Sequence, residues 1–500
     1  MDLQRFFDHW NLKEHPFQAE EALNDAVYNR MLKEAITHPD FTKIYGDPVN
    51  PGTTIVFGEK GSGKTAIRLM INRKLNDFNS ERQQGRAWIV SYEELNPMLD
   101  RLARHLKTND GEKIMNSITL ADHQDAILSL AVTGLVDQLL DSSDKNISKD
   151  MIKTLKKMNL QKRMNLGALA LLYDQPKHGQ ASERWPRLLK TLKMKAGLDR
   201  ARHGLFVGIA AVVGVIGALG WNFLPTPGPG WIVATVLGGG AAVLLGIWWM
   251  LREWRDGRMG RQLAREIRVV ARDKGESASK LWDFKKVDSA APLFPSRVDQ
   301  DSRFDLTGRF LDIIEELGYS SLVVLMDRVD EPVLINGDSK RMKLLVWPMF
   351  NNKFLQQERM GVKMLLPIEL SHMLASEDME FKRQARLDKQ NVVNPLKWTG
   401  ATLYDLCSWR FKNCQKNQEG TIPLDAMFDD DVESSYLIEA LDQMHQPRDA
   451  FKFLYAVVLE HCRNTPGDSE QYQISKATLD FVRRQQSERV VDLYRGVATS

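Results

Sequence analysis

The side chains with the clearest chemistry lie in a glycine-rich segment, GEKGSGKT, which runs from Gly58 to Thr65. It matches the pattern GxxxxGK[ST], in which glycines let the backbone curl and turn its amides towards phosphate oxygens. In that pattern Lys64 reaches the β- and γ-phosphates as a catalytic cation, and the Thr65 hydroxyl ligates Mg²⁺. The residues expected to bind the nucleotide are Gly58, Glu59, Lys60, Gly61, Ser62, Gly63, Lys64, Thr65 and Ala66.

A phosphate-binding loop needs a carboxylate at the end of a second strand to hold the metal. The best candidate is the segment SLVVLMDRVDE at 321–331, whose apolar run delivers Asp327 at the expected strand end. We expect Asp327 to bind Mg²⁺, and either Asp330 or Glu331 to activate the attacking water. The alternative is an acidic loop that merely follows a core strand.

The elements around these side chains have the required order. Residues 53–57 read as a short buried strand, and the segment AIRLMINRKL at 66–75 has helical spacing. Residues 86–91, 322–326 and 362–368 are further expected strands, and the helix 310–318 ends at a capping glycine, Gly318. The expected strand at 362–368 leads to Glu369, which is either a sensor of the γ-phosphate or a structural residue. An α/β fold with a parallel sheet follows.

Two uncharged apolar segments interrupt the chain between the loop and the carboxylates. Residues 204–224 and 230–251 are each long enough to cross a bilayer, and a short Pro- and Gly-containing connection joins them. Tryptophans near the ends and basic residues on both outer flanks favour a transmembrane hairpin whose flanks are cytoplasmic. A buried pair of helices in a large domain is the alternative.

Small residues and arginines follow regular spacings in and after this hairpin. Alanine and glycine recur every four residues in both segments, which suits close helix packing within one hairpin or between protomers. Arginines from Arg252 to Arg272 recur every three or four residues, along one side of an expected helix. The first of them suit anionic lipid headgroups, whereas those near Arg268 could meet another domain, a partner or nucleic acid.

Composition narrows the class further. The net charge of +3 does not mark a nucleic-acid-binding protein, and three cysteines without a CxxC pair support neither a disulfide framework nor a zinc site. The charged first thirty residues lack the apolar core of a secretory signal, so we expect a cytoplasmic N-terminus. The chain has no NKxD or TKxD motif for guanine and no LSGGQ-like signature, which favours ATP over GTP and argues against an ABC transporter.

With these motifs the chain resembles the KAP-type P-loop NTPases, in which transmembrane helices are inserted between the phosphate loop and the metal-binding carboxylate. The segment LMDRVDE is similar to the hhhhDxxDE form of the related AAA+ and STAND ATPases, with Arg328 where many of them have the catalytic glutamate. Residues 11–17 are similar to an N-terminal motif of origin-recognition-type ATPases that lies near the adenine. Residues 446–450 are similar to the start of a helical lid, which makes Arg448 a nucleotide-sensing candidate. Arg410 is a weaker candidate for a phosphate contact across subunits, or else a surface arginine.

The expected domain order is 1–118 for the N-terminal segment and first half of the NTPase domain, 119–203 for a helical insertion, 204–251 for the hairpin, 252–303 for a basic helix and linker, 304–430 for the second half and 431–500 for a helical lid. Thr119 and Asp122 are expected to cap a long helix that ends near Leu140. The resemblance implies a homo-oligomeric ATPase at the inner membrane, which couples Mg-ATP hydrolysis to switching or assembly in signalling or anti-phage defence, with an unidentified protein partner. The alternative is a tethered scaffold that binds ATP with little or no turnover.

Overall fold

A computed structural model describes residues 1–18, 21–30, 37–141, 145–175, 181–194, 247, 262–263, 265–270, 294–295, 300–416 and 420–498. The chain divides into two compact units. The first unit comprises Met1–Leu95 and Ser321–Ser500, and the second comprises Asn96–Ser320. The second unit therefore begins before the insertion expected at 119 and ends after the linker expected to stop at 303.

Five strands of the described chain form one sheet, in the order β2-β3-β4-β1-β5. Their bounds are Thr54–Gly58 for β1, Arg86–Tyr92 for β2, Tyr319–Met326 for β3, Met360–Pro367 for β4 and Asn391–Val393 for β5. The pairs β1–β4, β1–β5 and β3–β4 are parallel. Strand β4 thus separates β1 from β3, and the carboxyl ends of all three meet at one edge of the sheet.

The sequence predicts four of these strands to within a few residues. Strand β4 stops at Pro367, so the expected strand residue Ile368 instead begins a helix. Strand β5 was not predicted, because three residues are too short for a periodic pattern. The expected α/β class with a parallel sheet is confirmed.

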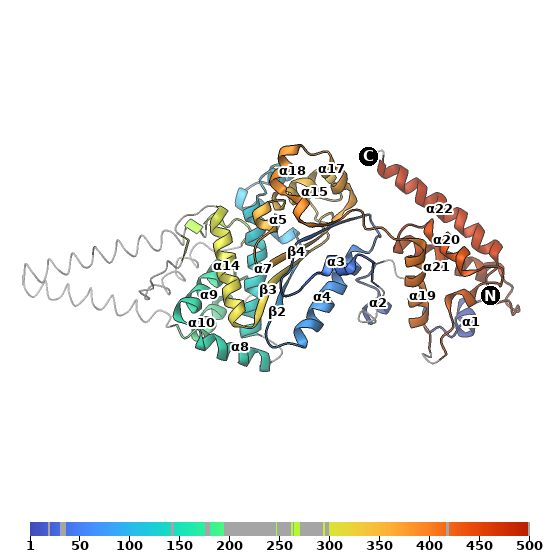
Figure 1. Ribbon diagram of the computed structural model, residues 1–500, viewed down its shortest axis with the longest axis horizontal. Coiled ribbons are helices and arrows are strands. Elements are labelled where there is room, and N and C mark those ends of the chain that lie inside the picture. Colours follow the sequence, from blue (N-terminus) through green and yellow to red (C-terminus); the bar gives the residue numbers. More distant parts are fainter. Residues whose placement is uncertain are drawn as a thin grey trace, which may run out of the picture. The chain divides into compact units, whose positions relative to one another are not determined.

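Helices α3 (Phe41–Tyr45) and α4 (Lys64–Ser80) pack against the strands (Figure 1). From α4, Ile67, Met70, Ile71 and Leu75 join a cluster with strand residues such as Val56 and Leu325. Burying each such aliphatic side chain contributes about 1.5–3 kcal/mol. This packing fixes the first turn of α4 against the carboxyl edge of the sheet.

The other helices of the sheet-containing part lie before β1 or after β3 and β4 in the chain. They are α2 (Ala26–Arg30), α15 (Ser339–Val346), α16 (Asn352–Leu355), α17 (Ile368–Ala375) and α18 (Met379–Ala385). Asp338 and Asp378 cap α15 and α18 by accepting hydrogen bonds from backbone amides.

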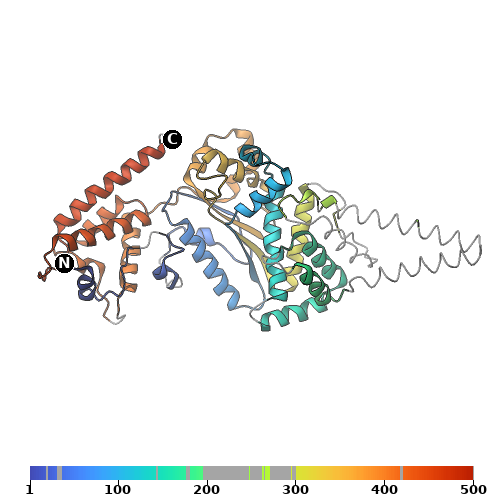
Figure 2. The same cartoon turned by 180° about the vertical axis from the view of Figure 1, so that it is seen from behind.

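The C-terminal helices share a second apolar core with the N-terminus. These helices are α19 (Gly400–Asn413), α20 (Ser434–Asp442), α21 (Pro447–Asn464) and α22 (Lys476–Ala498). Helix α1 (Leu3–His9) packs on α21, and Figure 2 shows the N-terminus beside the C-terminal helices. The amino group of Met1 donates a hydrogen bond of 2.7 Å to the Cys462 carbonyl. Pro447 occupies the first turn of α21, where its missing N–H costs no helical hydrogen bond.

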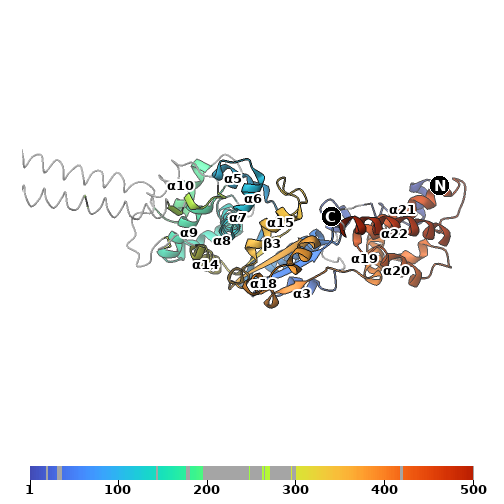
Figure 3. The same ribbon diagram turned by 90° about the horizontal axis from the view of Figure 1, so that it is seen from above.

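The second unit is mainly helical in its described residues (Figure 3). Its helices are α5 (Asn96–Leu106), α6 (Gly111–Asn116), α7 (Leu120–Leu140), α8 (Lys145–Lys157), α9 (Leu160–Tyr173), α10 (Ala181–Thr191) and α14 (Gln300–Glu316). The predicted cap of α7 is confirmed, because Thr119 and Asp122 form a reciprocal capping box. Gly318, the predicted cap after α14, has a positive φ of 91°.

Arg268 does not belong to a continuous arginine-lined helix. Residues 265–266 are helical, but residues 267–270 are not, so the helix expected to reach Arg272 ends earlier. The Arg268 guanidinium donates to the Asp122 carboxylate at 3.0 Å and to the Ser117 carbonyl at 2.9 Å. Both of these hydrogen bonds of Arg268 therefore go to acceptors in the second unit.

The expected hairpin at 204–251 lies outside the described residues, apart from residue 247. In the described part of the chain, no helix combines the length and the apolar character that crossing a membrane requires.

Candidate functional site

The glycine-rich loop connects the end of β1 to the start of α4, as the sequence predicts. Gly61 and Gly63 have positive φ angles of 103° and 91°, which other residues adopt only with strain. A Cβ atom on Gly58 would lie 2.5 Å from the Ser62 hydroxyl. These three glycines therefore allow a compact turn directly before the amino end of α4, where helix amides and the helix dipole favour an anion.

Lys64 folds back over this loop. Its ammonium donates hydrogen bonds to the Gly58 and Glu59 carbonyls at 2.8 and 2.9 Å. Burial lowers the pKa of Lys64, while the carboxylates of Asp327, Asp330 and Glu369 act in the opposite direction. The cation is thus held at the loop, in an electrostatic environment shared with three acidic side chains.

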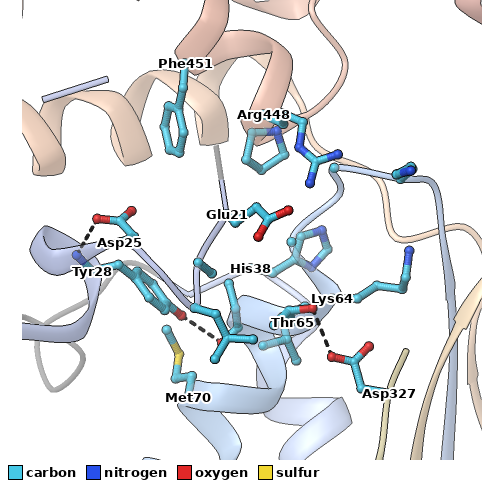
Figure 4. Close-up of a pocket in the computed structure, with 18 of the residues that line it drawn as sticks. Glu21, Asp25, Tyr28, His38, Lys64, Thr65, Met70, Asp327, Arg448 and Phe451 are labelled. Atoms are coloured by element: carbon cyan, nitrogen blue, oxygen red, sulfur yellow. Dashed lines mark hydrogen bonds between the residues drawn. The ribbon is translucent and has the colours of Figure 1, made fainter. Parts of the chain in front are cut away.

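Asp327 lies directly after β3 and reaches the start of α4. Its Oδ2 accepts a hydrogen bond of 2.9 Å from the Thr65 hydroxyl, which is 262 positions earlier in the chain (Figure 4). Arg68 contacts the same oxygen at 3.3 Å, and only 2% of Asp327 is exposed. The loop after β1 and the carboxylate after β3 therefore meet at one sheet edge, although β4 separates their strands.

Asp330 and Glu331, in the loop after β3, line a cavity that Lys64, Thr65 and Asp327 also border. Burial raises the pKa of Glu331, and the Arg328 guanidinium opposes this effect at 3.4 Å from its carboxylate. The Glu331 side chain is nevertheless 56% exposed. Both carboxylates are close enough to the cavity to take a proton from a water inside it.

Arg448 reaches the loop from the first turn of α21. Its backbone amide donates to the Gly61 carbonyl at 3.4 Å, and the neighbouring Gln446 side chain donates to the Glu59 carboxylate. A Cβ on Gly61 would lie 3.0 Å from the Cβ of Arg448. Figure 4 shows Arg448, Lys64, Thr65 and Asp327 around the same space.

These side chains border a cavity of about 300 Å³ with one polar and one apolar end. The polar end contains Lys60, Gly61, Gly63, Lys64, Thr65, Ala66, Asp327, Asp330, Glu331 and Arg448. The mainly apolar end contains Ala22, Leu23, Tyr28, Phe41, Ile67, Met70, Leu406 and Phe451, and the lining also includes Glu21, Asp25, His38 and Arg410. A ligand with an anionic end and a flat apolar end fits such a lining.

Residues 21–28 were missed as part of this cavity. The Tyr28 hydroxyl donates to the Ala66 carbonyl at 2.8 Å, which ties this segment to the first turn of α4. Residues 11–17, which were expected near the base, do not line the cavity but pack against the C-terminal helices, with Phe17 in their core. The described residues nearest in sequence that line the cavity are therefore Glu21, Ala22, Leu23, Asp25 and Tyr28, a segment that no periodic pattern marks.

Arg410 is buried, so its interpretation as a surface arginine was wrong. It is 2% exposed, donates to the Pro16 carbonyl at 2.7 Å and pairs with the Asp25 carboxylate. Its guanidinium also lies 4.6 Å from the ring centre of Phe451. These contacts within its own chain hold Pro16 and Asp25 against α19 beside the cavity.

Trp398 supports the loop from beneath and was also missed. Its indole N–H donates to the Ser62 carbonyl at 2.8 Å, and its ring contacts His38 edge-on at 4.9 Å. A single tryptophan after a three-residue strand carries no signal in the sequence, because only the tertiary fold places it under the loop.

The oxygen donors of this site suit Mg²⁺. Protein sites commonly provide one or two oxygen ligands to this cation, and phosphates and waters supply the others. Thr65 and Asp327 offer a hydroxyl and a carboxylate that already lie 2.9 Å apart on the wall of the cavity. In the described residues, no cluster of three or more His, Cys, Asp or Glu side chains forms an all-protein metal site.

Comparisons with protein-family models, curated proteins and solved structures gave no match.

Proposed function

We propose that this chain binds Mg-ATP in the cavity and hydrolyses it. The observation that carries the proposal is the hydrogen bond between Thr65 and Asp327, because it joins the two halves of a magnesium site across 262 positions. Two further residues that the sequence predicts to bind the nucleotide, Lys60 and Arg448, border the same cavity. An acidic loop without a role in binding gives no reason for this convergence.

Each group of residues has a defined task in this proposal. The loop amides and Lys64 bind the phosphates, and Arg448 adds a second cation. Thr65 and Asp327 would hold the Mg²⁺ ion, which as a Lewis acid would stabilise the negative charge on the phosphates. Asp330 or Glu331 accepts a proton from the water whose oxygen bonds to the γ-phosphorus, while the bond from that phosphorus to the bridging oxygen breaks. The mainly apolar end of the cavity binds the adenine base of ATP.

The proposal extends to KAP-like membrane attachment through residues 204–251. Two uncharged segments of bilayer length, with basic residues on their outer flanks, support it. Both units then lie on the cytoplasmic face, and hydrolysis is coupled to switching or assembly there. Sedimentation with membranes, and its loss when 204–251 is replaced by a short polar linker, tests this part.

The test of hydrolysis is phosphate release by detergent-purified protein with ATP, with and without Mg²⁺. Lys64→Ala and Asp327→Ala each remove a charge that acts on the phosphates or the metal, so we expect losses of roughly 100- to 1,000-fold in rate. Arg73→Ala, at an exposed position of the same helix that pairs with Asp77, is the control and retains the wild-type rate. Normal turnover in both site variants contradicts the proposal.

A second candidate is an ATP-dependent switch with little or no turnover. One observation favours it: Glu331 is 56% exposed and pairs with Arg328, which is a loose arrangement for a general base. This candidate requires tight nucleotide binding, with phosphate release no faster in the wild type than in Asp330→Ala or Glu331→Gln. The same assay therefore separates the two candidates.

A further inference from the structure

Arg68 is a buried cation that no motif in the sequence indicates. It lies four residues after Lys64 on α4, so the two side chains share one side of the helix. Its side chain is 4% exposed, and it contacts two carboxylates, Asp327 at 3.3 Å and Glu93 at 2.8 Å. A buried guanidinium requires such partners, because an unpaired charge in the interior is costly.

The contact with Asp327 constrains the direction of its carboxylate. Arg68 Nε and the Thr65 hydroxyl both donate to Oδ2, from positions one turn apart on α4. Two donors on one oxygen fix the carboxylate plane without using Oδ1. Metal-binding carboxylates are commonly oriented by hydrogen bonds of this kind from outside the ligand set.

Glu93 balances the charge that this arrangement introduces. A guanidinium next to a metal-binding carboxylate repels a divalent cation, and the effect is strong where water is excluded. The Glu93 carboxylate, which follows β2, neutralises Arg68 from the side of its Nη2 atom. Asp327 therefore keeps its own negative charge for a cation in the cavity.

We propose that Arg68, held by Glu93, is a positioning residue for the magnesium site. It orients Asp327, and it contacts neither the nucleotide nor the metal itself. This inference rests on the proposed function, because it assumes that Asp327 binds Mg²⁺.

The test measures metal binding separately from nucleotide binding. Arg68→Met removes the donors and keeps most of the side-chain volume, so we expect about tenfold weaker Mg²⁺ affinity in the presence of a non-hydrolysable ATP analogue. The analogue should bind in EDTA within about twofold of its wild-type affinity, because that binding does not use Asp327. Arg68→Lys restores part of the metal affinity. Titration with Mn²⁺, followed by electron paramagnetic resonance, should show a similar relative loss of affinity in Arg68→Met for a second divalent cation.

The matched control is Arg73→Met on the same helix. Arg73 is exposed and pairs with Asp77 at 3.3 Å, away from the metal site. It should leave both affinities unchanged. Unchanged or tighter metal binding in Arg68→Met overturns the inference, whereas a wild-type protein that binds no Mg²⁺ with the analogue overturns the proposed function instead.

Two further variants cover the case in which Arg68→Met fails to fold. Glu93→Gln changes a side chain that is 25% exposed and leaves Arg68 without its balancing charge, so Mg²⁺ affinity should fall severalfold. The double variant Arg68→Met/Glu93→Gln removes both charges together, so no buried charge is left unpaired, and it should bind Mg²⁺ about tenfold more weakly than the wild type. Wild-type metal affinity in either variant contradicts the positioning role.

Discussion

Lys363 is a buried ammonium within the sheet that has no carboxylate partner among its described contacts. It lies in β4, is 2% exposed, and donates to the Gly52 carbonyl at 2.8 Å and to the Thr54 hydroxyl at 3.3 Å. Burial lowers its pKa to about 8. Carbonyl and hydroxyl oxygens satisfy its protons, but they offset the loss of hydration only in part.

This burial predicts a pH dependence of folding stability. The folded pKa lies below the unfolded value of about 10.4, so the unfolded chain binds more protons between pH 8 and 10.4. The free energy of unfolding of the wild type, relative to Lys363→Met, should therefore rise by up to about 3 kcal/mol across this range and stay level below it. Urea unfolding at pH 7, 8, 9 and 10 measures the difference. A flat or falling difference contradicts the assignment.

Single residues also mark how far the sequence could predict the site. Lys64, Thr65 and Asp327 follow from local motifs, because a loop pattern and a strand end can be recognised in the chain itself. Arg68 and Trp398 could not be predicted, because their roles depend on contacts with Asp327 and Ser62 that only the folded chain creates.

At the scale of elements, the docking of α21 on the glycine-rich loop has the clearest consequence. Gly61 has a φ of 103°, and a Cβ there would lie 3.0 Å from both Arg448 and Gln446. Gly85 has a φ of 72° with no atom within 4 Å of its added Cβ. The two glycines thus separate the effect of backbone strain from the effect of contact with α21.

Gly61→Ala and Gly85→Ala should both lose roughly 1–2 kcal/mol of unfolding free energy through the left-handed backbone. Only Gly61→Ala should also displace Arg448, and we expect it to weaken ATP binding about tenfold, which is about 1.4 kcal/mol. Thermal unfolding and a fluorescent-nucleotide titration measure the two quantities. Equal nucleotide affinity in the two variants means that α21 does not contribute to binding.

Elements with strong patterns were predicted well, and weak patterns failed. The strands from β1 to β4 and the capped helix α7 carry long apolar or capping signals. Strand β5 and the segment 21–28 have neither, and their positions depend on pairing with β1 and contact with α4. The basic helix was overextended because arginine spacing alone cannot show where a helix ends.

At the scale of the whole molecule, the candidate site belongs to one unit although the chain leaves that unit in between. Residues 96–320 form the second unit, and both the glycine-rich loop and Asp327 belong to the first. The sequence could predict that the chain comes back to the first unit, because a phosphate loop requires a carboxylate partner. It could not place the boundaries at 95 and 320, which depend on contacts within each unit.

The most direct test of the central claim is the effect of Mg²⁺ on nucleotide affinity in Asp327→Ala. If the two chain segments form one magnesium–nucleotide site, Mg²⁺ tightens binding of a non-hydrolysable ATP analogue to the wild type, and Asp327→Ala abolishes most of this gain while binding in EDTA is retained. Asp388→Ala, at an exposed carboxylate, serves as the control and keeps the full gain. An equal gain from Mg²⁺ in Asp327→Ala and the wild type would contradict the account.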